Sequence, residues 1–208
     1  MAVRQGKAAL YFHNVFLEHD TGRHVECRER LSVPLTYLAS RGHLAGFEEI
    51  KPQAAGVEDI ARIHAGEYIE AVKNLSEAGG GWADADTFIS KATYRAAIYA
   101  AGAACDAASA ALTGRYSHAL AFARPPGHHA TRYAAKGFCI FNNIAIAAAR
   151  LLAAGSVERL AILDFDVHHG NGTQAAFYRD GRVIFVSFHR WPFYPGTGAA
   201  SETGEGPG

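Results

Sequence analysis

Residues 160–172 read L-A-I-L-D-F-D-V-H-H-G-N-G, and this stretch is the strongest indication of the fold in the sequence. It opens with four apolar residues, which is typical of a strand buried on both faces of a parallel sheet. It then turns polar, and the alternation of side chains along a strand predicts that Asp164, Asp166 and His168 point the same way. Because ligands bind at the carboxyl ends of strands in open α/β sheets, the stretch predicts a ligand site.

The donor types in this stretch favour a metal. Zinc accepts carboxylate oxygen and imidazole nitrogen, and a catalytic zinc keeps one position open for water. Ferrous iron and cobalt would suit the same donors. The plainer alternative is a polar loop that only caps the strand. However, two acids and two histidines between Asp164 and His169 are costly to desolvate unless they are paired or bind a metal.

A second pair of histidines, His128 and His129, follows the short apolar run 119–123 in the loop R-P-P-G-H-H-A. If the two strands are neighbours, their polar ends meet. A carboxylate raises the basicity of a histidine, whereas an amide orients it without adding charge, and Asp164 and Asn171 are available for these two roles. The pattern is typical of a general acid/base pair beside a metal. Taken alone, two histidines in such a loop would equally suit a structural feature.

The composition excludes several other classes. Twenty basic residues balance twenty acidic ones, so direct nucleic-acid binding is not expected. The three cysteines have no C-x-x-C spacing, which favours reduced thiols in the cytoplasm. The N-terminus lacks the apolar region of a secretory signal, and no apolar run is long enough for a membrane span.

The alternation of elements predicts one doubly wound α/β domain over residues 1–208. Strands are expected at 8–13, 119–123, 160–163 and 182–188. Helices are expected at 30–40, 57–64, 65–75, 91–112, 142–154 and 173–178. Pro34 is expected in the first turn of its helix. Loops or turns are expected at 19–30 and 76–81, and the tail from residue 195 has no periodicity.

Four motifs, R-P-P-G-H-H-A, G-F-C-I-F-N-N, D-F-D-V-H-H-G-N-G-T and P-F-Y-P-G-T-G, together resemble the histone deacetylase superfamily. The pattern is most like that of class II and bacterial deacetylase-like or acetoin-utilisation proteins, from about residue 11 to the end. The resemblance implies the arginase–deacetylase fold, in which helices flank a parallel β-sheet.

The resemblance also implies a role for individual residues. The ligands of a catalytic zinc would include Asp166 and His168. The general base and acid would be His129, held by Asn171, and its electrostatic partner would be His128, held by Asp164. A structural potassium ion would be bound by Asp164 and Ser187, with backbone oxygens of Asp166, His168 and Phe188. The acyl-lysine tunnel would have aromatic walls at Phe138 and Tyr194, a rim acid at Asp84 and an exit channel near Arg30. Phe138 and Tyr194 could instead be ordinary core aromatics.

The implied activity is metal-assisted hydrolysis of the acetyl amide of N-acetyl-lysine or a related acetylated amine. Protein acetyl-lysine, an acetylpolyamine and a small acyl amide all remain open as substrates. The family also needs a later Asp ligand and a later Tyr, and no residue here matches either by motif. We therefore expect the N-terminal portion of a deacetylase domain, incomplete at its C-terminal end, and self-association through the edge of a cut sheet. The alternatives are a catalytically incomplete remnant or interaction module and, more weakly, an arginase-type ureohydrolase.

Overall fold

The structure of the chain is a computed structural model that describes residues 7–208. The strands are β1 (Ala8–Tyr11), β2 (Phe47–Ile50), β3 (Gly80–Asp84), β4 (Thr87–Ser90), β5 (His118–Ala121), β6 (Leu160–Asp164) and β7 (Val183–Ser187). The helices are α1 (Val15–Glu18), α2 (Glu29–Ser40), α3 (Val57–Ile60), α4 (Gly66–Glu77), α5 (Thr93–Leu112), α6 (Asn143–Ala153) and α7 (Asn171–Phe177). The predicted α/β class, with parallel strands flanked by helices, is confirmed.

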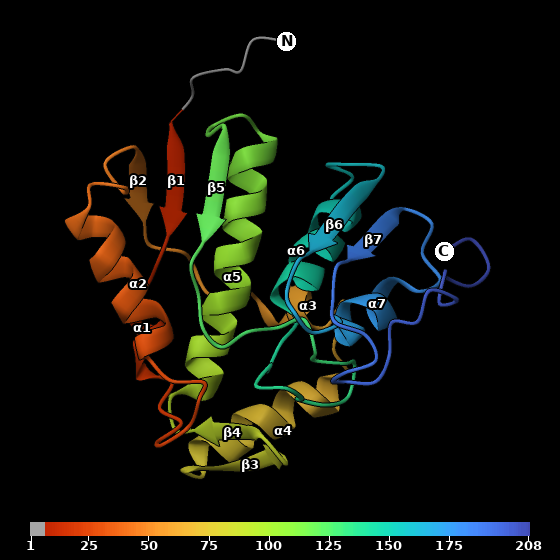
Figure 1. The fold of residues 1–208 in the computed structure, drawn as a ribbon, viewed down its shortest axis with the longest axis horizontal. Helices are drawn as coiled ribbons and strands as arrows, with labels where there is room; N and C mark the ends of the chain where they lie inside the picture. The colour runs from red at the N-terminus through yellow and green to blue at the C-terminus, as the bar shows by residue number, and fades with distance from the viewer. Residues whose placement is uncertain (1–6) are drawn as a thin grey trace.

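The parallel strands form two sheets rather than the single sheet that the sequence predicts. One sheet has the order β2-β1-β5, and the other pairs β6 with β7. Every pairing in these two sheets is parallel. Figure 1 shows β5 and β6 separated across the middle of the molecule. The two sheets are joined through their helices, since β5 packs on α5, β6 shares a core cluster with α6, and α5 packs against α6.

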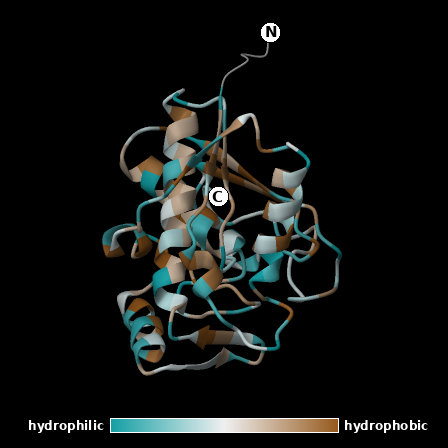
Figure 2. Ribbon diagram, turned by 90° about the vertical axis from the view of Figure 1, so that its left-hand side faces the viewer, coloured by the Kyte–Doolittle hydropathy of each residue, from teal (hydrophilic) through white to brown (hydrophobic). Residues whose placement is uncertain are grey.

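Helix α5 lies at the centre of the core because its alanines allow close approach on two sides. Ala96 and Ala100 belong to the cluster that covers the β2-β1-β5 sheet. Ala97 and Ala101 belong to the cluster that α5 shares with α6, β6 and β7. Alanine also favours the helix intrinsically. In Figure 2 the strands carry long hydrophobic stretches, whereas the surrounding helices alternate between hydrophobic and hydrophilic residues.

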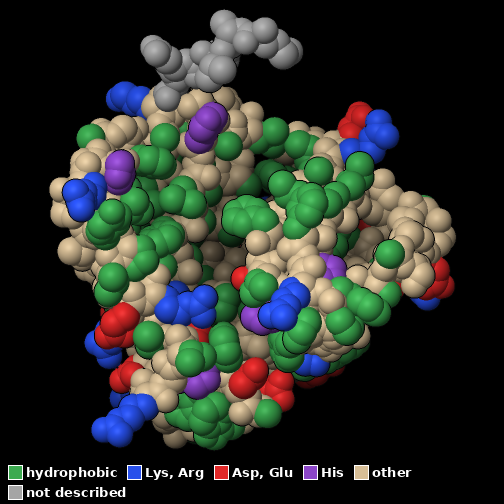
Figure 3. Space-filling view, in the orientation of Figure 1, with side chains coloured by type: hydrophobic (Ala, Val, Ile, Leu, Met, Phe, Trp, Pro, Cys, Tyr) green, Lys and Arg blue, Asp and Glu red, His purple; other side chains and the backbone are tan. Residues whose placement is uncertain are grey.

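The β6–β7 sheet is buried on one face only, so the expectation of a strand buried on both faces is wrong. Ile162 faces the core, whereas Leu163 is 59 % exposed. The register pairs Leu163 with Val186, and Ile184 on the same side is 65 % exposed. Figure 3 shows hydrophobic side chains gathered over this part of the molecule. An apolar run in the sequence indicates a hydrophobic strand, but it does not show whether other elements pack on one face of that strand or on both.

Three smaller expectations also need correction. The run 119–123 is not a buried strand, because β5 exposes His118 and Leu120. Pro34 lies inside α2 rather than in its first turn. Because proline has no N–H, it cannot donate a backbone hydrogen bond to the preceding turn of the helix. The turn expected at 76–81 leads instead into the antiparallel hairpin β3–β4. An edge-to-face contact between Trp82 and Phe88, with centroids 5.2 Å apart, stabilises that hairpin.

The carboxyl ends of the parallel strands point to one side of the molecule. In Figure 1 the arrowheads of β1, β5, β6 and β7 all point toward its lower half, where the loops that leave these strands gather. The two histidine-bearing loops follow β5 and β6 and meet on this side of the molecule, although β5 and β6 lie in different sheets and are not the neighbouring strands that the sequence argument assumed. Within residues 7–208, no helix has the length and apolarity needed to cross a membrane.

Candidate active site

The loop between β5 and α6 carries His128 and His129 and is held by backbone contacts. The N–H groups of Gly172 and Thr173 donate to the His128 carbonyl at 2.9 Å and 3.2 Å. These are first-turn donors of α7, which have no partner within their own helix. The contact places the start of α7, including Asn171, beside the two histidines.

His128 is paired with the carboxylate at the end of β6. His128 Nδ1 lies 2.9 Å from Asp164 Oδ2. Because a carboxylate only accepts, Nδ1 carries the proton. Burial acts to raise the pKa of Asp164, but the hydrogen bond and charge of His128 outweigh it and lower that pKa. The pair therefore keeps a negative charge against the His128 ring.

His129 is paired with a neutral amide instead. His129 Nδ1 lies 2.8 Å from Asn171 Oδ1, so Nδ1 donates and Nε2 is left as the free acceptor. Burial, followed by the neighbouring charge of His128, lowers the pKa of His129 to about 4. The two rings lie 4.0 Å apart between centroids. The site thus holds one histidine beside a charge and one neutral histidine with an unprotonated nitrogen.

Asp166 and His168 follow β6 and are open to solvent, with side chains 46 % exposed. Asp166 Oδ1 lies 3.2 Å from His168 Nδ1, and the His168 N–H donates to the same carboxylate at 2.8 Å. His128 Nε2 lies 4.0 Å from Asp166 Oδ1. These donors fit zinc in kind and closeness, but they are two protein ligands. Over residues 7–208 no cluster of three or more His, Cys, Asp or Glu side chains converges on one point.

We call His128, His129, Asp164, Asp166 and His168 the histidine edge. Aromatic residues border it. Tyr194 lies edge-on to His129 and to His168, with centroids 5.0 Å and 5.7 Å apart. Phe138 follows Gly137, and a Cβ added at Gly137 would lie 2.4 Å from His129 Cδ2. Only glycine fits this approach, so the backbone that leads into Phe138 runs close to the His129 ring.

The predicted rim acid lies near Tyr194. Asp84 ends β3, and its carboxylate accepts from the Ala85 N–H at 2.7 Å. Burial, then the charges of Asp86 and Asp84, raise the pKa of Tyr194 to about 12. Both acids therefore act on the same ring.

The remaining predicted residues are more dispersed. Asp164 and Ser187 are register partners at the ends of β6 and β7, and the Phe188 N–H donates to the Asp164 carbonyl at 2.9 Å. The structure thus brings the predicted potassium ligands side by side. Arg30 lies in the first turn of α2 with an exposed side chain. Its role in an exit channel stays a prediction.

Two further histidines, His64 and His189, are held by hydrogen bonds within the fold. His64 Nδ1 lies 2.8 Å from the Thr131 carbonyl, and His64 Nε2 accepts from the Asn142 N–H at 2.9 Å. Burial lowers the pKa of His64 to about 4, which keeps the ring neutral and able to bridge both groups. His189 lies between Ser187 Oγ and the Gly198 carbonyl.

Sequence reasoning missed a buried polar group that involves His19, Glu26 and Arg124. Glu26 and Arg124 are 98 residues apart, so no local spacing indicates that they meet. One signal was available, since Arg124 is a lone charge between an apolar strand and two prolines. A buried charge of that kind needs a partner.

Comparisons with known proteins agree with this geometry. A family model described as "Histone deacetylase domain" matches residues 24–208. A "Probable deacetylase" of Archaeoglobus fulgidus is 43 % identical over 96 % of this chain and 56 % of that protein. A "Histone deacetylase-like amidohydrolase" of Pseudomonas aeruginosa is 45 % identical over 73 % of this chain and 40 % of that protein.

A solved structure agrees as well. The HDA15 HD domain superposes with a TM-score of 0.91 at 37 % identity, covering 97 % of this chain and 59 % of that one. This likeness identifies the arrangement of strands and helices as the deacetylase fold and leaves the ureohydrolase alternative without support. The matches cover between 40 % and 59 % of the length of these three proteins. On the match over residues 24–208 and these identities, the chain belongs to the histone deacetylase domain family.

Proposed function

We propose that the chain is part of a zinc-dependent deacetylase that hydrolyses the acetyl amide of N-acetyl-lysine or a related acetylated amine. The observation that carries the proposal is the histidine edge. A neutral histidine with a free Nε2, a second histidine hydrogen-bonded to a carboxylate and two metal-type donors lie together beside Tyr194.

In this proposal Asp166 and His168 hold the zinc from this chain's side. When bound, the ion would supply polarisation of the acetyl carbonyl and of a water molecule. Ferrous iron would fit the same two donors. A potassium ion beside Asp164 and Ser187 is proposed on the adjacency of these residues at the strand ends.

The chain's own residues would move the proton. His129 Nε2 accepts a proton from the attacking water and later donates it to the leaving amine. Asn171 fixes the ring without adding negative charge, so His129 releases the proton readily. His128, held by Asp164, lies beside the His129 ring. Phe138 and Tyr194 would bury the aliphatic stem of the acylated lysine, as apolar clefts do.

The test is hydrolysis of an acetyl-lysine peptide and of an acetylated polyamine by the purified 208-residue chain with added zinc. We expect turnover that His129→Ala removes and that His43→Ala, a change of an exposed histidine, leaves intact. Turnover that survives His129→Ala would contradict the proposed role. The two substrates distinguish a protein target from a small amine.

A second function is favoured by one observation. The described residues hold two convergent metal ligands, whereas a catalytic zinc site has three protein ligands. On this alternative the chain is a deacetylase-fold interaction module without activity of its own. A folded chain that neither hydrolyses any acetyl amide nor binds zinc would favour it.

We also propose self-association through the bare face of the β6–β7 sheet, and a cytoplasmic location. The first rests on the exposure of Ala161, Leu163, Ile184 and Val186, since a contiguous apolar patch favours association. A monodisperse monomer in light scattering would contradict it.

The proposed cytoplasmic location rests on Cys27, Cys105 and Cys139, which are free thiols.

A further inference from the structure

A buried arginine cluster, made of His19, Glu26 and Arg124, lies at the start of the loop that leads to His128. The side chains of Glu26 and Arg124 are 1 % and 3 % exposed. Arg124 Nε donates to Glu26 Oε1 at 2.6 Å, and Arg124 Nη2 donates to Glu26 Oε2. Two parallel bonds between a guanidinium and a carboxylate leave the pair little freedom.

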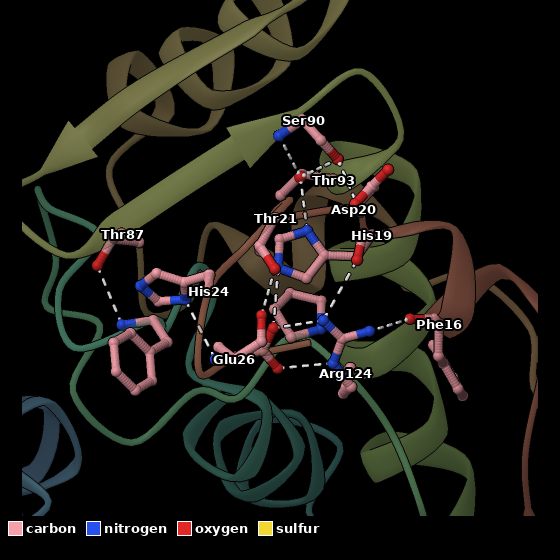
Figure 4. Close-up of polar contacts among 12 residues, drawn as sticks. Phe16, His19, Asp20, Thr21, His24, Glu26, Thr87, Ser90, Thr93 and Arg124 are labelled. Carbon is pink, nitrogen blue, oxygen red and sulfur yellow. Dashed lines mark hydrogen bonds and ion pairs between the residues drawn. The ribbon is translucent and has the colours of Figure 1, made fainter. Parts of the chain in front are cut away.

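The other guanidinium donors bind backbone. Arg124 Nη1 donates to the Phe16 carbonyl at 3.0 Å, and Nη2 also donates to the His19 carbonyl at 3.2 Å. Figure 4 shows the guanidinium between the Glu26 carboxylate and the Phe16 carbonyl. One side chain thus fixes three points of segment 16–26. Because a buried charge must keep its partners, this segment cannot shift without a large loss of stability.

His24 extends this anchor to the aromatic border of the histidine edge. The Glu26 N–H donates to His24 Nδ1 at 3.1 Å. The His24 ring lies edge-on to Phe138, with centroids 5.0 Å apart and planes at 88°, and it also faces Trp82 at 6.2 Å. Phe138 has a φ of +69° and donates its N–H to Thr87 Oγ1 at 3.0 Å. Phenylalanine rarely adopts that conformation, so surrounding contacts must hold it.

The strained Gly137–Phe138 turn contacts the His129 ring. Gly137 packs so closely on the His129 ring that an added Cβ would lie 2.4 Å from Cδ2 and 2.9 Å from the Tyr194 hydroxyl. A displacement of the Gly137–Phe138 backbone would therefore push on both rings.

We propose that Arg124 and Glu26 are positioning residues: their buried pair holds segment 16–26 so that His24 supports Phe138, and the Gly137–Phe138 turn fixes the His129 ring. Arg124 acts on the histidine edge along the chain, through the loop to His128, and across space, through His24. The His24 ring packs against Phe138 on one side and Trp82 on another.

The test is histidine side-chain NMR of the full 208-residue chain and its Glu26→Gln variant, which keeps the shape of the side chain and loses its charge. We expect resolved displacements of the His24 and His129 signals, with those of His118 and His189 unmoved. A merely structural loss would move all four, and that result, or unmoved signals of His24 or of His129, would overturn the proposal. Arg179→Gln, which breaks the exposed Arg179–Glu205 pair, is the control and should move none of them.

If Glu26→Gln does not fold, His24→Ala tests the same path, because it leaves the Arg124–Glu26 pair intact and His24 is only half-buried. The His129 signals should then move; unmoved His129 signals would overturn the proposal. A second readout concerns hydrolysis and rests on the proposed function. His24→Ala should raise KM for an acetyl-lysine peptide more than it lowers kcat. Since the NMR signals do not depend on turnover, an inactive chain with the expected displacements supports the positioning role while contradicting the proposed function.

Discussion

The arginine cluster and the histidine edge both pair a carboxylate with a basic side chain, but their carboxylates differ in exposure to solvent. In the arginine cluster, Glu26 and Arg124 satisfy each other in a sealed interior. On the histidine edge, the side chains of Asp166 and His168 are nearly half exposed, so their oxygen and nitrogen atoms remain accessible to a metal ion or another ligand. A sealed ion pair contributes to structure and geometry, whereas an open pair is available to a ligand. His129 is itself buried, so what distinguishes the histidine edge is the open Asp166–His168 pair beside it.

The largest effect should come from breaking the sealed pair. Arg124→Met leaves Glu26 charged and buried, so we expect the free energy of unfolding to fall by about 3–5 kcal/mol. The exposed pair of Arg179 and Glu205 gives the contrast, with about 1 kcal/mol or less for Arg179→Gln. Urea denaturation measures both. Similar losses in the two variants would remove the distinction between sealed and open groups.

A pH titration separates the buried histidines from exposed groups. Burial and then the charge of Arg124 lower the pKa of His19 to about 3, and burial lowers that of His64 to about 4. Both folded values lie below the ordinary 6.5, so the unfolded chain binds more protons as the pH falls below 6.5. Stability is then fully present above that value and is lost toward pH 4 and 3, by up to about 1.4 kcal/mol per pH unit for each histidine.

Urea midpoints across this pH range measure the slope. His64→Gln offers a donor and an acceptor but does not titrate, so its slope should be smaller. An unchanged slope in the variant, or a stability that stays flat below pH 6, would contradict the assignment.

A smaller effect is expected at the contact between the aromatic wall and the edge. Gly137→Ala places a Cβ against His129 at a φ of +54°, whereas Gly155→Ala meets open space at a φ of +63°. Both variants carry the same backbone strain, so their difference isolates the steric clash. We expect Gly137→Ala to cost about 1–3 kcal/mol more in thermal unfolding. Equal costs would show that the His129 ring has room to move.

Asn171→Asp should have the smallest effect on stability, but it should change the protonation of His129 clearly. A carboxylate in place of the amide favours the charged imidazole, so the pKa of His129 should rise from about 4 toward its ordinary 6.5. Histidine NMR against pH measures it, with His189 as the internal reference. A pKa that stays in place would mean that Asn171 does not control His129.

The sequence predicts the histidine edge well because its information is local. The motif after β6 keeps Asp164, Asp166 and His168 close in the chain, although β6 ends at Asp164 and strand alternation does not extend to the other two. The loop after β5 supplies His128 and His129. Periodicity cannot report which faces are covered, so the apolar run alone could not assign the bare side to Leu163 and Val186. The arginine cluster was missed because its partners meet only through the folded chain. The hairpin β3–β4 was missed because its first strand opens with two glycines, which weaken a strand pattern.

The most direct test of the account is a zinc titration of the 208-residue chain followed by histidine side-chain NMR. We predict that the His168 signals move in a saturable way, with smaller changes at His128 and His129, while His19 and His64 stay in place. Asp166→Asn should weaken this response. Saturable zinc binding that leaves His168 unmoved, or that shifts His19 and His64 equally, would contradict the claim that the open edge is the chemical site of this molecule.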